Sequence, residues 1–257
     1  MTLPPEIFTI VHHYLPICDI SSLAFTNSDV NRWIDMDDVI REYRLVREDE
    51  KTSLVKTACQ HGYINLLMYL HRTKNVIPEM AMEWANGHLS IAKYLYTIGV
   101  DPTYDHNRAI ILASSNGHLD VIKYLCTVGA NPFVTQNYPL RLASENGHLH
   151  VVQYLCSIGA DPRAFFDSSI RRACENGHLP VVKYLYSLGA DPTSNNDYAI
   201  IRASRNGHLS MVEYLCSVDA DPTANNNEPI RLANRYGHYL VVKFLREQGA
   251  SLDFFDG

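Results

Sequence analysis

The chain has 257 residues and a formal net charge of −6. The negative charge argues against a general basic surface for nucleic acid or anionic lipid. Residues 1–16 lack the basic region of a secretory leader, and no segment approaches the roughly 20 apolar residues that a membrane helix needs. We therefore expect a soluble, intracellular protein.

The first element that the sequence predicts is a short amphipathic helix. Pro4 suits its first turn, where the N–H that proline lacks would have no partner. Pro16 ends the pattern, and Asp19 is a suitable N-cap for a second short helix, with a third to follow. The prediction depends on the helical spacing of the apolar residues Ile7, Ile10, Val11, Tyr14 and Leu15.

This segment resembles an F-box, a family whose motif begins Leu-Pro-x-Glu-Ile, continues to Tyr-Leu and is followed by an acidic residue with Ile or Leu. The resemblance extends from the start of the chain to about residue 40. One departure concerns the third helix, because Val30 stands roughly where the family has a tryptophan and Trp33 comes later. The motif positions are here Leu3, Pro4, Glu6, Ile7, Tyr14, Leu15, Asp19, Ile20 and Leu23.

The resemblance implies a function for the segment. In the F-box family these helices dock on the Skp adaptor of a cullin-type ubiquitin ligase. The alternative is that residues 1–50 only cap the apolar face of the first repeat that follows. The docking face that the resemblance implies consists of Leu3, Pro4, Ile7, Val11, Leu15, Ile20 and Leu23.

From Asp35 to Lys51 the chain is highly charged and has only a partial apolar face. This pattern predicts a solvated connecting helix. We place a domain boundary near Glu50, which gives an F-box-like helical segment at residues 1–50 and a repeat region at residues 51–257.

A Gly-His pair organises the rest of the chain. It is followed by leucine in most copies, and it returns at a constant spacing along the sequence. A fixed period between 20 and 50 residues indicates a solenoid or propeller of stacked units. The pairs begin at Gly87, Gly117, Gly147, Gly177, Gly207 and Gly237.

One unit, residues 191–220, shows the plan. An Asp-Pro turn leads into a polar loop, and Asp197 is placed to cap a first short helix. Gly207 ends that helix in a left-handed conformation, and a second helix follows. Glycine ends the second helix in other units, so Asp219 predicts a local strain of about 1 kcal/mol here.

The repeated phrase from Asn-Gly-His-Leu to Gly-Ala-Asp resembles ankyrin repeats over most of residues 51–257. The resemblance implies an all-α, helix-turn-helix solenoid of about seven repeats that binds other proteins. The period is 30, where the family has 33, which predicts shortened finger loops between units. With its F-box-like front end, the chain looks like the ankyrin proteins of giant DNA viruses of amoebae, which implies the host cytoplasm, with the nucleus as an alternative.

The histidines of the Gly-His pairs do not predict a metal site. Equivalent residues of stacked units lie roughly 10 Å apart, whereas zinc ligands lie about 2 Å from one centre. We expect these histidines to help cap the second helix by hydrogen bonding. The sequence also lacks the phosphate-binding, dinucleotide-binding, zinc-protease and nucleophile-elbow motifs, so we expect no cofactor and no enzymatic activity.

The six cysteines show no metal-binding spacing. We expect buried free thiols in a reducing compartment. Tyr96 and Tyr186 fill, in other units, the repeat position that three of the cysteines occupy, which indicates an apolar packing role for Cys126, Cys156 and Cys216.

Positions that vary between units are the candidate contacts with a target protein. Phe165 and Phe166 are two aromatics on a polar loop, which suits an interface anchor unless one of them tucks under the neighbouring loop. The arginines of the first helices form either a basic stripe for an acidic segment or an ordinary surface paired with Glu145, Glu175 and Glu228. The predicted target-binding residues are Tyr104, Phe133, Arg141, Arg163, Phe165, Phe166, Arg171 and Arg202.

Taken together, the patterns predict a monomeric, non-enzymatic adaptor. Its repeats select a target protein, and its F-box-like segment docks on a Skp-type adaptor, which brings the target to a ubiquitin ligase. The alternative is a repeat scaffold or blocking protein in which residues 1–50 only cap the solenoid. We expect neither nucleic acid nor a membrane among its partners.

Overall fold

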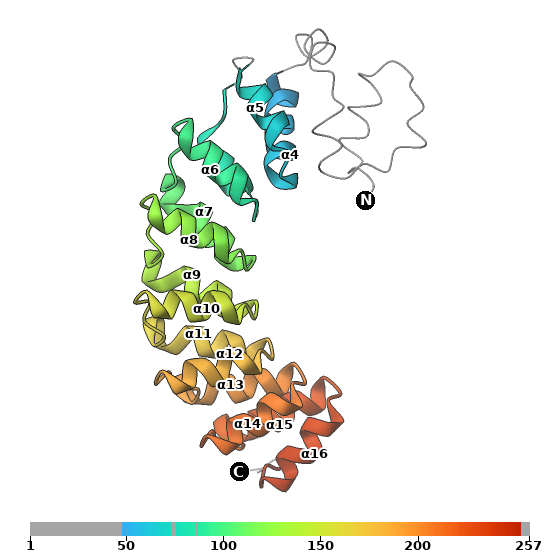
Figure 1. Cartoon of the computed structure of the whole chain (residues 1–257). Helices are drawn as coiled ribbons and strands as arrows, with labels where there is room; N and C mark the ends of the chain where they lie inside the picture. The colour runs from blue at the N-terminus through green and yellow to red at the C-terminus, as the bar shows by residue number, and fades with distance from the viewer. Residues whose placement is uncertain (1–47, 73–75, 86, 253–257) are drawn as a thin grey trace. The chain divides into compact units, whose positions relative to one another are not determined.

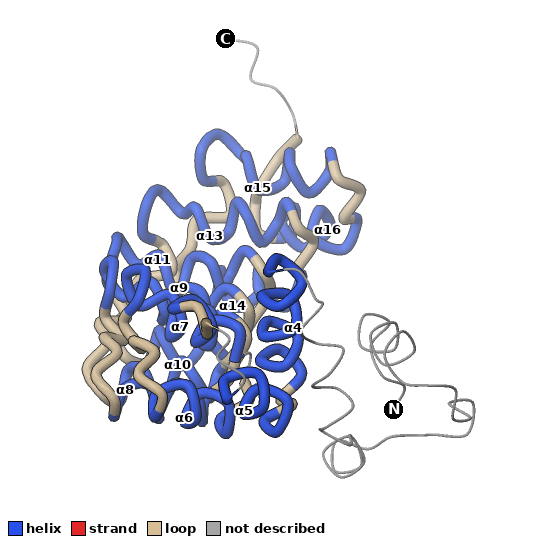
Figure 2. The backbone as a smooth tube through the Cα atoms, turned by 90° about the horizontal axis from the view of Figure 1, so that it is seen from above, coloured by secondary structure: helices blue, strands red, loops and turns tan. Residues whose placement is uncertain are grey.

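The computed structural model describes residues 48–72, 76–85 and 87–252 (Figure 1). Within these ranges the chain forms fourteen helices and no strand. In Figure 2 the described backbone is drawn as blue helices and tan loops. The all-α prediction is therefore confirmed for the described part of the chain. The predicted F-box-like helices lie outside it, and with them the expected docking residues Leu3, Pro4, Ile7, Val11, Leu15, Ile20 and Leu23.

The chain divides into two compact units, and the division falls between Asp105 and His106. The boundary expected near Glu50 borders the undescribed residues and stays a prediction. The described part of the first unit contains three α-helices and one 3-10 helix: α4 (Glu48–His61), α5 (Ile64–Arg72), η2 (Glu79–Ala85) and α6 (Leu89–Thr97). Its buried core includes Leu67, Leu70, Ile91 and Leu95.

The second unit is a regular series of helix pairs. Its helices alternate between twelve-residue first helices and nine-residue second helices. They are α7 (Tyr104–Ser115), which begins at the end of the first unit, α8 (Leu119–Thr127), α9 (Val134–Glu145), α10 (Leu149–Ser157), α11 (Ala164–Glu175), α12 (Leu179–Ser187), α13 (Ser194–Arg205), α14 (Leu209–Ser217), α15 (Ala224–Arg235) and α16 (Tyr239–Glu247).

The first helices α9, α11, α13 and α15 lie side by side and form one layer of the second unit (Figure 1). A fully buried alanine recurs in each of them, and its short side chain lets the helices approach closely. The second helices α10, α12, α14 and α16 form the other layer. The core between the layers is filled by large apolar residues such as Leu155, Ile170, Leu185 and Ile200.

The turn between the two helices of each repeat packs directly on the next repeat. Gly147 has φ +76°, and a Cβ atom at this position would lie 2.5 Å from the ring of His178 in the following repeat. The same arrangement joins Gly117 to His148 and Gly177 to His208. Only glycine fits here, because it supplies the left-handed backbone and leaves room for the imidazole ring.

The histidines of these turns do not cap the second helix with their side chains, contrary to the expectation from the sequence. His148 and His208 occupy the N-cap positions of α10 and α14, but neither ring makes a cap hydrogen bond. Their Nε2 atoms instead lie 2.9 Å from the carbonyl oxygen of Ser115 and 3.0 Å from that of Glu175, both in the preceding repeat. The ring therefore joins neighbouring repeats, a role that the position next to a helix start did not reveal.

The second helices end as predicted, in a residue with positive φ. Glycine takes this place after α8, α10, α12 and α16, and Asp219 takes it after α14 with φ +69°. The strained aspartate that the sequence predicts is thus confirmed. In each case the next backbone N–H closes the helix end, for example from Ala190 to the carbonyl of Leu185 at 3.1 Å.

The repeat cysteines are less buried than expected. Cys126, Cys156 and Cys216 are free but only half-buried, whereas Cys59 and Cys174 are fully buried. Burial raises the pKa of Cys59 to about 12 and that of Cys156 to about 11. These thiols therefore stay protonated near neutral pH, which agrees with a packing role.

In the part of the chain that the structure describes, no helix combines the length and the apolar character that crossing a bilayer requires.

Candidate protein-binding surface

Near the start of α9, α11, α13 and α15 the backbone leaves the right-handed helical conformation for three residues and forms a tight loop, which we call the finger. Each finger contains three consecutive residues with positive φ, and none of them is glycine. Each such residue costs roughly 1–2 kcal/mol, so the surrounding contacts must hold the finger in place. Fingers of this kind lie at residues 135–137, 165–167, 195–197 and 225–227.

The last residue of a finger ties it to the next finger. The Oδ1 atom of Asp167 accepts a hydrogen bond from the backbone N–H of Asp191 at 2.9 Å, and Asp197 accepts one from Asp221 at 3.1 Å. Burial raises the pKa of Asp197, an effect that this hydrogen bond opposes. The sequence predicted Asp197 as the cap of its own helix. The structure shows that Asp167 and Asp197 link neighbouring repeats, since their side chains reach the following loop.

An arginine six residues after the start of the finger fastens its backbone in three repeats. We call Arg141, Arg171 and Arg231 the finger arginines. Arg141 Nη2 donates to the carbonyl oxygen of Thr135 at 3.1 Å, Arg171 Nε donates to that of Phe166 at 2.9 Å, and Arg231 Nη2 donates to that of Asn225 at 3.3 Å. The sequence shows that arginine recurs at this position, but not that it binds the chain's own loop.

Arg141 is packed between two aromatic rings. Its guanidinium carbon lies 4.8 Å from the ring centre of Tyr138 and 4.6 Å from that of Phe165. Burial, together with the positive charge of Arg172, lowers the pKa of Arg141. Only 6% of the residue is exposed, so Arg141 has little surface for a partner, contrary to the sequence prediction. Its guanidinium group interacts with the carbonyl oxygen of Thr135 and with the rings of Tyr138 and Phe165.

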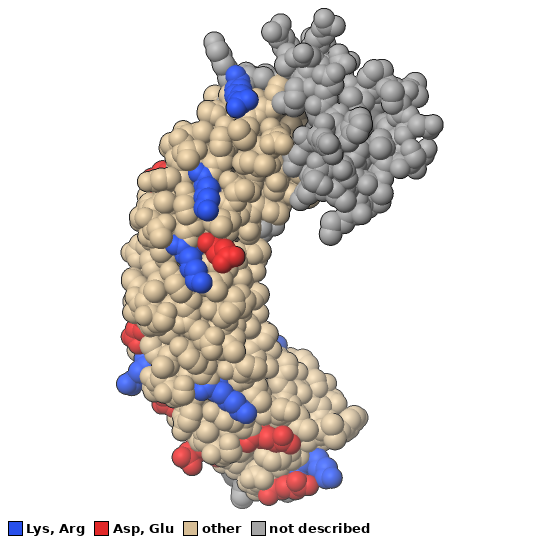
Figure 3. Space-filling model, in the orientation of Figure 1, with Lys and Arg blue, Asp and Glu red and all other residues tan. Residues whose placement is uncertain are grey.

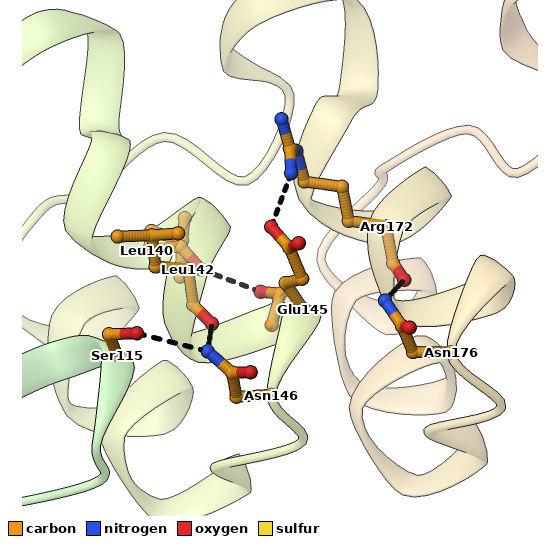
Figure 4. A network of polar contacts seen from close by, with 8 residues as sticks. Ser115, Leu140, Leu142, Glu145, Asn146, Arg172 and Asn176 are labelled. Carbon is orange, nitrogen blue, oxygen red and sulfur yellow. Dashed lines mark hydrogen bonds and ion pairs between the residues drawn. The ribbon is translucent and has the colours of Figure 1, made fainter.

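Two further arginines of the first helices, Arg172 and Arg202, contact acidic groups of the chain itself. Arg202 Nε lies 3.8 Å from a carboxylate oxygen of Glu175, and Arg172 forms an ion pair with Glu145, drawn in Figure 4. Arg171 and Arg202 also lie over the ring of Tyr198, at 5.4 and 4.8 Å.

Of the two alternatives for these arginines, the geometry favours the ordinary paired surface for Arg172 and Arg202. Glu228 differs from the expectation, because its carboxylate accepts a hydrogen bond from the side-chain amide of Asn225. On the face drawn in Figure 3, the charged side chains are scattered among uncharged surface and form no continuous patch of one sign.

The two phenylalanines of the second finger have different environments. Phe165 is 49% exposed and rests against Arg141 of the preceding repeat, while Phe166 is 78% exposed. The sequence left open whether these rings are interface anchors or whether one of them packs on a neighbouring loop. The structure shows both, since Phe165 packs on the preceding repeat while Phe166 is largely exposed. Phe133 and Arg163 are also exposed on the finger side of the second unit. Tyr104 is exposed as well, but it belongs to the first unit.

A depression of about 520 Å³ lies beside the third finger, between α13 and α15. Its lining includes Asn195, Tyr198, Ile201, Asn225 and Glu228. This site was not among those predicted from the sequence. The feature of the sequence that could have indicated it is Ile201, which occupies the repeat position where other units have a finger arginine.

The described residues contain no group of three or more His, Cys, Asp or Glu side chains that could hold a metal ion. The finger side of the second unit exposes aromatic rings, among them Phe133, Phe165 and Phe166, and aromatic side chains are enriched in protein interfaces.

Comparison with known families agrees with this geometry. A family model that describes ankyrin repeats in three copies matches residues 79–165 and 170–256, which together make up more than half of the chain. No curated protein matches the sequence.

Proposed function

The chain belongs to the ankyrin-repeat family, a family of protein-protein interaction modules, and we propose that it binds its target protein through the fingers and first helices of the second unit. The observation that carries this proposal is the exposed pair Phe165 and Phe166. Large exposed aromatic side chains on a fixed backbone are typical anchors of protein interfaces.

The contacts of the second finger support this role. Arg171 donates to the carbonyl oxygen of Phe166, and Asp167 accepts from the backbone of Asp191. Both contacts hold the finger in its left-handed conformation before any partner arrives. An anchor that is already ordered loses little conformational entropy on binding, and this favours affinity.

More specifically, we propose that the chain is an adaptor of a ubiquitin ligase in the cytoplasm of a host cell. In this form residues 1–50 dock on a Skp-type adaptor while the repeats hold the target, and the ligase acts because the target is kept nearby. Its support is the resemblance of the residues around Leu3, Ile7 and Leu15 to an F-box. The alternative is a scaffold or blocking protein in which the same residues cap the repeats.

The target surface is tested by affinity capture from a host lysate with a matched control. We would compare the native chain with Phe165→Ala/Phe166→Ala and with Tyr239→Ala/Leu240→Ala. The control pair is 80% and 68% exposed and lies at the start of α16, at the other end of the helices from the fingers. A protein retained by the native chain and the control, and bound at least about tenfold more weakly by the finger variant, supports the proposal. Equal capture by all three would contradict it.

The ligase role needs a separate measurement. The purified full chain would be titrated against a Skp-type adaptor, beside a variant with Leu3, Pro4 and Ile7 changed to alanine. Binding that the variant loses supports the adaptor. A folded native chain that does not bind would leave the scaffold as the function.

A further inference from the structure

We propose that the depression beside Ile201 receives an arginine side chain of the target protein, whose guanidinium takes the place that a finger arginine occupies in other repeats. The inference rests on the proposed function, because the depression lies on the same finger surface. It adds the chemistry of one side chain that the target must present.

The chain itself provides the template for this contact. In three repeats a finger arginine donates to the carbonyl oxygen of the residue five or six positions earlier, at 2.9–3.3 Å. The third finger has the same left-handed backbone at Asn195 and Asn196. Ile201 carries no donor, so the carbonyl of Asn195 lacks the arginine bond that its counterparts Thr135 and Asn225 accept.

Ile201 also explains why a depression exists at this place. Isoleucine fills only the part of the space that the arginine stem occupies in the other repeats, and Ile201 is itself buried. The outer part of that space, toward the finger, stays open. Asn195 and Ile201 both line the resulting depression, whose volume of about 520 Å³ exceeds that of one arginine side chain.

The lining of the depression suits a guanidinium group. Asn195, Asn196 and Asn225 bring amide and backbone oxygens, and Glu228 adds a carboxylate held by the amide of Asn225. Arginine presents five donors in one plane, so it can bond to several of these acceptors at once. Hydrogen bonds from a charged donor to carbonyl or carboxylate oxygens are stronger than those between two neutral groups.

An acidic side chain of the target fits the depression less well. The cation in the lining is Arg202, which lies over Tyr198 and 3.8 Å from Glu175, so its charge is already balanced within the chain. A carboxylate entering the depression would also approach Glu228. The charge balance of the site therefore favours a cation. Because the site corresponds to the one that a planar guanidinium group occupies in other repeats, it favours arginine over the ammonium group of lysine.

The test is an NMR titration of the isotope-labelled full chain with N-acetyl-arginine amide, which needs no knowledge of the target. N-acetyl-citrulline amide has nearly the same shape without the charge, and N-acetyl-glutamate amide tests the acidic alternative. We expect saturable shifts of the side-chain amides of Asn195, Asn196 and Asn225 and of the Ile201 methyl groups with the arginine ligand only. A single side chain should bind with a dissociation constant on the order of millimolar.

Three variants sharpen the result. Ile201→Arg restores the residue type found at this position in neighbouring repeats, so it should fold, fill the depression with its own guanidinium and abolish the shifts. Glu228→Gln should weaken binding at least about threefold. Glu213→Gln makes the same charge change on the exposed side of α14 and should leave binding unchanged.

The proposal is overturned if tens of millimolar arginine ligand give no saturable shift, if citrulline acts equally well, or if Ile201→Arg still binds. Shifts with the glutamate ligand alone would replace it with an acidic partner. These outcomes are independent of the capture experiment. A target lost by the Phe165→Ala/Phe166→Ala variant, without arginine binding, would keep the proposed surface and refute the arginine receptor alone.

Discussion

The two ends of each repeat are built on different principles. At the turns of Gly117, Gly147, Gly177 and Gly207, one steric fit repeats, in which the histidine of the next repeat covers the glycine of the one before, as His178 covers Gly147. At the finger, the strained backbone repeats but the side chains change, from Phe165 and Phe166 in one unit to Asn195 and Asn196 in the next. The turn therefore holds neighbouring repeats together, whereas the finger combines a fixed backbone with surface side chains that differ from repeat to repeat.

The largest effect is expected where the turn is disturbed. Gly147→Ala should lower the free energy of unfolding by about 2–4 kcal/mol, because the new Cβ would collide with His178 and the backbone would remain left-handed. Gly189 also has a positive φ, but the Cβ of Gly189→Ala would meet nothing within 4 Å. This variant should therefore lower the free energy of unfolding by only about 1 kcal/mol. Urea unfolding of both variants measures the difference. Equal losses would show that the histidine contact does not hold the turn.

Within the fingers, a smaller effect separates a buried arginine from an exposed one. Arg141→Ala should cost about 1–2 kcal/mol, because it removes a hydrogen bond to Thr135 and the packing between Tyr138 and Phe165. Arg231→Ala removes an exposed arginine that binds its finger at 3.3 Å, and it should cost about 0.5 kcal/mol or less. Thermal unfolding of the two variants checks the order. A larger loss for Arg231→Ala would contradict the importance of the aromatic packing.

A gain in stability is expected at α14, the one second helix of the second unit that ends without glycine. Asp219→Gly should raise the free energy of unfolding by about 0.5–1 kcal/mol, because glycine accepts φ +69° without the steric cost that aspartate carries. Denaturant midpoints of the variant and the native chain measure it. A loss of stability would mean that the Asp219 side chain makes a contact worth more than the strain.

The smallest expected effect concerns pH at the turn. Burial, reinforced by the nearby histidines, lowers the pKa of His208 below its ordinary value of 6.5. The folded chain then takes up this proton at a lower pH than the unfolded chain, so the stability present above pH 6.5 falls as the pH drops from 6.5 through the lowered value. His208→Gln should reduce this pH dependence in unfolding experiments between about pH 8 and pH 5. If the free energy of unfolding of His208→Gln changed with pH as steeply as that of the native chain, His208 would have the same pKa in the folded and the unfolded chain.

The sequence by itself was sufficient to predict the periodic framework. The constant spacing of the Gly-His pairs and the glycines at the helix ends indicated a solenoid of helix pairs, and the sequence also predicted the strain at Asp219. These features are local, because φ/ψ preference and side-chain size act within a few residues. They can therefore be inferred without knowing which residues meet across the fold.

Only the tertiary structure decided what the side chains of the turns and fingers contact. His148 bonds to Ser115 across 33 residues, Asp167 to Asp191 across 24, and Arg141 meets Phe165 of the following repeat. Each of these residues had a plausible local or surface role in the sequence, as a cap or as a contact. Stacking changes that role, because it places donors, acceptors and rings of neighbouring repeats within reach of one another. The depression at Ile201 exists for the same reason, since it is formed by two adjacent repeats and belongs to neither alone.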